Sequence, residues 1–76
     1  MSYDRERATE LVLALMQVTV HEKVRTWKSY DWEVMTDLFE RGYISDPRSK
    51  AKSVVLTDAG MQRSQEMFAK YLAVRA

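Results

Sequence analysis

The chain has 76 residues, of which 46% are hydrophobic and 30% are charged, and it contains no cysteine. This composition is typical of a single soluble globular domain, and the absence of cysteine excludes disulfide bonds and thiolate metal sites. The formal net charge of +1 is close to balance, so total charge gives no reason to expect a nucleic acid or a membrane surface. The longest mainly apolar run, Leu11 to Met16, is far shorter than the roughly 20 residues of a membrane span, and a cytoplasmic protein is expected.

The first predicted helix covers about residues 4–22 and begins after a capping residue, either Ser2 or Asp4. Its apolar residues extend around most of the helix, so most of its surface should be buried. A domain of this size supplies a small core, which favours a second copy as the additional partner. We therefore predict a homodimer through this helix; the alternative is a central helix enclosed by its own chain. The predicted dimer interface is Leu11, Val12, Leu15 and Met16.

A short connection, residues 21–29, follows this helix. Val24 and Trp27 are spaced to anchor one irregular turn on the core. His21 is the only histidine in the chain, and without cysteine or a second imidazole we expect no metal site there.

The second predicted helix covers about residues 30–41, with Ser29 or Asp31 as its cap and Gly42 as its stop. Its predicted core face consists of Trp32, Met35, Leu38 and Phe39. Four carboxylates also lie on it and give it an acidic surface: Asp31, Glu33, Asp37 and Glu40.

A hairpin over about residues 43–56 and a third helix over about residues 58–74 complete the predicted elements. Asp46 and Pro47 favour a turn, and Val54 and Leu56 share one face of the return strand. Arg48, Lys50 and Lys52 make the tip and the outgoing strand basic. Thr57 is a suitable cap for the third helix, and Gly60 allows close approach to the hairpin. The predicted buried stripe of this helix is Met61, Ser64, Phe68, Tyr71 and Leu72, with Met67 on its flank.

Several residues around the hairpin carry a family resemblance: Leu38, Gly42, Tyr43, Ile44, Val54, Leu56, Thr57 and Gly60. Their pattern resembles the wing region of bacterial winged-helix regulators of the multiple-antibiotic-resistance type. The segment from Trp27 to Gly60 is also similar to a family of small bacterial proteins of unknown function. We therefore expect one α+β domain over residues 1–76, mostly helical and winged-helix-like, with three helices and a two-stranded hairpin between the second and third. Because residues 21–29 leave no room for a complete helix, the helix-turn-helix is truncated.

Two functions follow from these features. The acidic second helix is repelled by phosphates, which argues against insertion into a DNA groove and favours an interaction or adaptor module with a protein partner. The alternative is a DNA-binding transcriptional regulator that contacts phosphates through Arg48, Lys50 and Lys52 of the wing. The same lysines and arginine also suit a solvated edge that prevents sheets from pairing.

Enzymatic chemistry has little support in the sequence. Glu33 and Asp37 share a helix face, but no further metal ligands or phosphate-binding loop accompany them. No serine has a histidine base in its sequence context. We therefore expect a non-enzyme with no cofactor, no metal, no small-molecule substrate and no membrane association.

Overall fold

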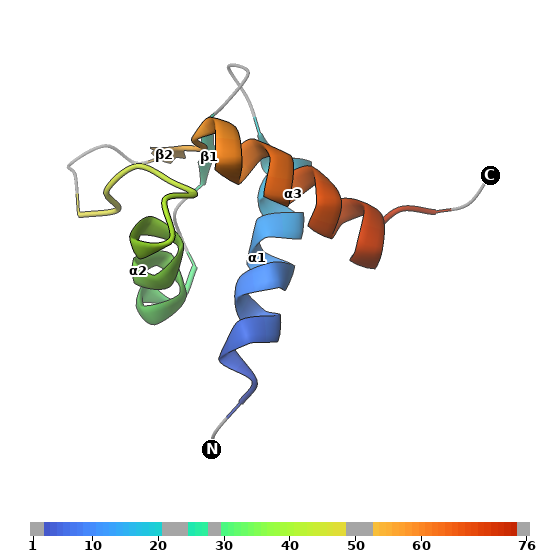
Figure 1. The fold of residues 1–76 in the computed structure, drawn as a ribbon, viewed down its shortest axis with the longest axis horizontal. Helices are drawn as coiled ribbons and strands as arrows, with labels where there is room; N and C mark the ends of the chain where they lie inside the picture. Colours follow the sequence, from blue (N-terminus) through green and yellow to red (C-terminus); the bar gives the residue numbers. More distant parts are fainter. Residues whose placement is uncertain (1–2, 21–24, 28–29, 49–52, 75–76) are drawn as a thin grey trace.

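The structure is a computed structural model that describes residues 3–20, 25–27, 30–48 and 53–74. Its elements, in chain order, are α1 (Arg5–Thr19), β1 (Arg25–Trp27), α2 (Trp32–Glu40), β2 (Ser53–Val55) and α3 (Asp58–Tyr71) (Figure 1). Three helices and a two-stranded antiparallel sheet make a small, mostly helical α+β fold, as the sequence predicts. All three helices are shorter than expected. Within the described ranges no helix is long and apolar enough to cross a bilayer.

Each helix begins at a side chain that the sequence identifies as a cap. Asp4 accepts a hydrogen bond from the backbone N–H of Arg7, Asp31 from that of Val34, and Thr57 from that of Gly60. These bonds satisfy N–H groups that have no partner inside the helix.

The end of α2 is fixed by Gly42, whose φ of +78° lies in the left-handed region. The N–H of Gly42 donates to the carbonyl of Phe39, and the N–H of Tyr43 donates to the carbonyl of Leu38, each at 3.0 Å. This pair of bonds is the Schellman motif, in which a residue without a side chain is favoured at the left-handed position. The predicted glycine stop is confirmed.

The sheet differs from the predicted hairpin. β2 pairs along its length with β1, with Thr26 opposite Val54, so part of the connection predicted as an irregular turn is a strand. The hairpin's own pairing is reduced to one bridge, between Ile44 and Leu56, with a hydrogen bond of 2.9 Å from the Ser45 N–H to the Val55 carbonyl. β2 therefore lies between β1 and the segment that follows α2.

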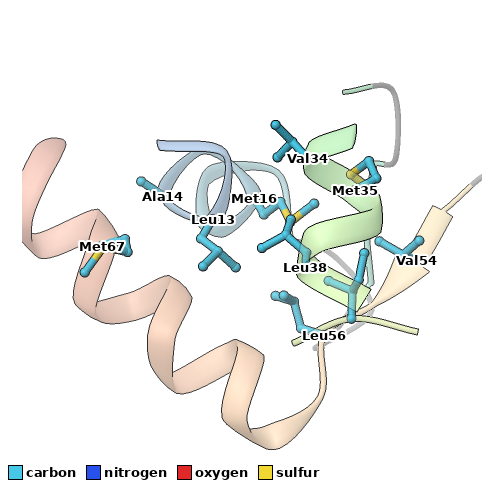
Figure 2. Close-up of a cluster of buried hydrophobic side chains, with 10 residues drawn as sticks. Leu13, Ala14, Met16, Val34, Met35, Leu38, Val54, Leu56 and Met67 are labelled. Atoms are coloured by element: carbon cyan, nitrogen blue, oxygen red, sulfur yellow. The ribbon is translucent and has the colours of Figure 1, made fainter. Parts of the chain in front are cut away.

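The core lies where α1 is covered by α3, α2 and β1, and Figure 1 shows α3 crossing α1. Its buried hydrophobic side chains, most of them labelled in Figure 2, are Leu13, Ala14, Met16, Val34, Met35, Leu38, Ile44, Val54, Leu56 and Met67. Two sequence expectations are wrong here. Val34 rather than Trp32 belongs to the core face of α2, and Met67 rather than Leu72 is buried on α3.

Candidate interaction surface on α2

Helix α2 has one buried face and one open face. Val34, Met35 and Leu38 are at most 2% exposed and pack into the core. The opposite side, which we call the α2 outer face, consists of Trp32, Glu33, Thr36, Asp37 and Glu40. These positions recur at helical spacing and therefore lie on one side of the helix.

Trp32 is the large apolar residue of this face. Its side chain is 55% exposed although tryptophan is the largest apolar residue type. It lines two adjoining hollows. The first, which we call the Trp32 hollow, has a volume of about 220 Å³ and is lined by Trp32, Thr36, Phe39, Glu40, Pro47 and Arg48. The second is more open and is lined by Arg5, Trp32, Glu33, Thr36, Asp37 and Glu40. An exposed tryptophan beside hollows is typical of an interaction surface.

The carboxylates of the outer face are partly compensated by α1. Arg5 contacts Glu33, with an Nη2–Oε2 distance of 2.9 Å, and Asp37, with an Nη1–Oδ2 distance of 3.5 Å. The guanidinium thus occupies the position between the two carboxylates that a divalent cation would need. Among the described residues, no group of three or more histidine, cysteine, aspartate or glutamate side chains is placed to hold a metal ion.

Glu40 differs from these two carboxylates. It is exposed and forms no ion pair or hydrogen bond through its side chain with any residue of the described part of the chain. Three carboxylates against one guanidinium leave the α2 outer face with a negative charge. This face therefore attracts cationic groups.

The fourth predicted acidic residue, Asp31, has a different role. Its side chain caps α2 and accepts a hydrogen bond of 3.4 Å from the hydroxyl of Tyr3. At the other end of the helix, the Arg41 guanidinium donates two hydrogen bonds to the carboxylate of Glu6, with lengths of 2.6 and 2.9 Å. Hydrogen bonding and charge in this pair raise the pKa of Arg41 and lower the pKa of Glu6. Both residues attach α2 to the N-terminal part of the chain.

The predicted basic wing is only partly described. The Arg48 guanidinium pairs with both carboxylate oxygens of Asp46, at 3.0 and 2.9 Å, and its central carbon lies 5.9 Å from the centre of the Phe39 ring. The hydrogen bond to Asp46 raises the pKa of Arg48. Arg48 is thus held at the edge of α2. Lys50 and Lys52 lie outside the described residues, so DNA contact through the wing stays a prediction.

The four residues of the predicted dimer interface do not lie on one surface. Met16 is fully buried in the core of its own chain, and Val12 is half-buried against that core. Leu11 and Leu15 are 38% and 44% exposed, and Val18, one helical turn further, is 60% exposed. Met16 is therefore not available to a partner. The remaining stripe of Leu11, Leu15 and Val18 carries the dimer prediction, which stays a prediction.

Comparison with known proteins places the chain in a family. The model of the domain of unknown function DUF6429 matches residues 4–74. The chain belongs to this family. It is also 46% identical over 68 residues to the uncharacterized protein y4hR of Sinorhizobium fredii (strain NBRC 101917 / NGR234), covering 90% of this chain and 92% of that protein. No solved structure matches the chain. The family of unknown function expected from residues 27–60 is thus confirmed over almost the whole chain.

Sequence reasoning found the carboxylates of the α2 outer face but missed Trp32, Thr36 and Pro47 as parts of a surface. Trp32 precedes Thr36 by four residues, which places both on one side of a helix. Val34 and Leu38 are related in the same way on the buried side. The spacing of four residues therefore separates Trp32 and Thr36 from the buried pair, and it could have placed Trp32 on the outer face. The contribution of Pro47 depends on the path of the chain after Gly42, which no local pattern specifies.

Proposed function

We propose that this protein is a non-enzymatic interaction module whose α2 outer face binds a basic segment of a partner protein. The observation that carries the proposal is the exposed Trp32, which lines the same hollows as Glu33, Asp37 and Glu40. Interfaces commonly centre on an aromatic anchor, while surrounding charges select the partner and speed association. The three carboxylates of the α2 outer face outnumber the one guanidinium, that of Arg5, so a partner with positive charge complements this face.

The winged-helix resemblance fits this proposal. Between α1 and α2 the described residues form strand β1, where a helix-turn-helix would have its first helix. We propose a reduced winged helix that has lost the companion helix and presents α2 to a protein. Carboxylates in the position of a recognition helix are unsuited to a DNA groove because phosphates repel them.

The proposal is tested with a peptide of stated chemistry. A blocked octapeptide of alternating arginine and glycine is titrated into isotope-labelled protein, and its uncharged counterpart, with citrulline for arginine, serves as the ligand control. We expect the arginine peptide alone to bind and to shift resonances of Trp32, Thr36 and Glu33 by nuclear magnetic resonance.

A pair of variants with equal charge change separates this surface from general electrostatic attraction. Glu33→Lys changes the α2 outer face, whereas Glu66→Lys makes the same change on α3, where Glu66 is exposed. Glu33→Lys is expected to weaken peptide binding by about fivefold, in line with roughly 1 kcal/mol for an exposed ion pair. Glu66→Lys should leave it nearly unchanged. Equal effects of the two variants would refute the proposal, as would tight binding of a mixed-sequence DNA duplex through residues 45–48.

A further inference from the structure

The Trp32 hollow already lies beside a cation of this chain. The guanidinium of Arg48 lies over the ring of Phe39, 5.9 Å from its centre, and both residues line the hollow. Cations are attracted to the faces of aromatic rings. The Trp32 ring lines the same hollow, and among the described residues no cationic side chain lies over it.

The charges around the hollow leave room for one more cation. The Arg48 guanidinium already has a carboxylate partner, Asp46, to which it donates two hydrogen bonds, at 3.0 and 2.9 Å. Glu40, which also lines the hollow, has no side-chain partner in the described part of the chain. The hollow therefore combines an open aromatic surface, the ring of Pro47 and one unpaired carboxylate.

This combination suits an arginine side chain more closely than other groups. A guanidinium is planar, stacks on tryptophan and pairs with a carboxylate through two hydrogen bonds, while its aliphatic stem covers apolar surface. An ammonium group has no plane to stack and binds water more strongly. A carboxylate or phosphate would meet Glu40 and be repelled.

We propose that the Trp32 hollow binds one arginine side chain of the partner, stacked on Trp32 and paired with Glu40, and that Arg48 is an internal cation that competes with it. This inference rests on the proposed function and adds to it a site for one side chain. Competition has a physical basis because the incoming guanidinium meets the positive charge of Arg48 in the same hollow. Arg48 thus lowers the affinity of the hollow for its ligand.

Removal of the Arg48 side chain need not disturb the turn that carries it. The backbone N–H of Arg48 donates to Oδ1 of Asp46 at 2.9 Å, and this bond does not depend on the guanidinium. Arg48→Gln therefore opens the hollow and retains the local backbone. Arg7→Gln, at an exposed position of α1, is the matched control with the same change in charge.

The test uses acetyl-arginine methylamide as the probe and acetyl-citrulline methylamide as its neutral counterpart. In a magnetic resonance titration, Arg48→Gln is expected to strengthen arginine binding by about threefold, whereas Arg7→Gln leaves it unchanged. Glu40→Gln should weaken binding by about threefold, and Glu66→Gln should not. Contacts between the probe and the Trp32 ring should appear as intermolecular Overhauser effects, and circular dichroism checks each variant for folding.

The outcomes distinguish this inference from the proposed function. If the arginine–glycine octapeptide responds to Glu33→Lys but the probe responds to neither Glu40→Gln nor Arg48→Gln, the inference is wrong and the proposed function stands. If the probe binds as expected but the octapeptide does not bind, the hollow is confirmed and the wider interaction surface is refuted. Equal binding of the arginine and citrulline probes would overturn the inference directly.

Discussion

Gly60, in the first turn of α3, lies against the backbone carbonyl of Tyr43, so closely that a Cβ atom on residue 60 would overlap the carbonyl oxygen. The same oxygen accepts a hydrogen bond of 3.0 Å from the N–H of Thr57. The hydroxyl of Thr57 donates to the carbonyl of Gly42 at 2.5 Å and accepts from the N–H of Gly60. The start of α3 is thus attached to the segment that leaves α2. This attachment gives Thr57 and Gly60 a structural role.

Gly60→Ala is expected to lower the free energy of unfolding by about 1–3 kcal/mol, because the backbone must move to admit a methyl group. Urea denaturation followed by circular dichroism measures this change. Gly42 offers a contrast, since its φ of +78° strains other residues but no atom lies within 4 Å of a Cβ there. Gly42→Asn should therefore cost less than Gly42→Ala, because asparagine tolerates the left-handed region. A Gly60→Ala variant as stable as the wild type would contradict the close packing.

Local patterns predicted the parts of this fold that depend on neighbouring residues. The sequence offers Asp4 and Asp31, each beside an alternative serine, and Thr57 as caps, because such a bond joins a side chain to a backbone group three residues later. Gly42 was identified as a helix stop for a similar reason. Such contacts are specified within one turn of the chain.

Contacts between distant residues were the ones that sequence reasoning missed. β1 has only three residues, and its partner Val54 follows Thr26 by 28 positions, so no local alternation indicates the strand. Thr26 is fully buried, with its hydroxyl 2.8 Å from that of Thr19 and 3.3 Å from the carbonyl of Met16. A polar strand residue whose partners lie on α1 resembles a surface residue in the sequence. Trp32 was misassigned for the opposite reason, because a large apolar residue resembles a core residue.

Glu10 connects α1 to α3 and should make stability depend on pH. Its side chain is 17% exposed. The carboxylate accepts hydrogen bonds from the Tyr71 hydroxyl at 2.5 Å and from the Lys70 ammonium at 3.3 Å, and it forms an ion pair with Arg63 at 3.6 Å. These groups, Tyr71 first, hold the pKa of Glu10 below its ordinary value of 4.5, although burial acts in the opposite direction.

Because this pKa is lower in the folded than in the unfolded chain, the ionised carboxylate stabilises the fold above the unfolded value. That contribution is lost as the pH falls through the folded pKa. Between neutral pH and about pH 3, the urea midpoint of wild type should therefore fall further than that of Glu10→Gln. Tyr71→Phe should move the pKa of Glu10 upward in a magnetic resonance titration. An unchanged pKa in that variant would show that the tyrosine hydroxyl is not its cause.

The last prediction concerns the exposed stripe of α1, formed by Leu11, Leu15 and Val18 at helical spacing. If two chains pair through this stripe, Leu15→Glu should raise the dissociation constant by about a hundredfold, since each protomer loses roughly 1.5 kcal/mol of apolar burial. Sedimentation velocity at micromolar concentration measures the change. Gln65→Glu adds the same charge at an exposed position of α3 and should leave the association unchanged.

Leu15 is suitable for this test because it is 44% exposed in its own chain, so the variant should fold. Met16, beside it, is fully buried, and a charge there would unfold the domain and give no information about pairing. A wild-type protein that sediments only as a monomer would refute the homodimer.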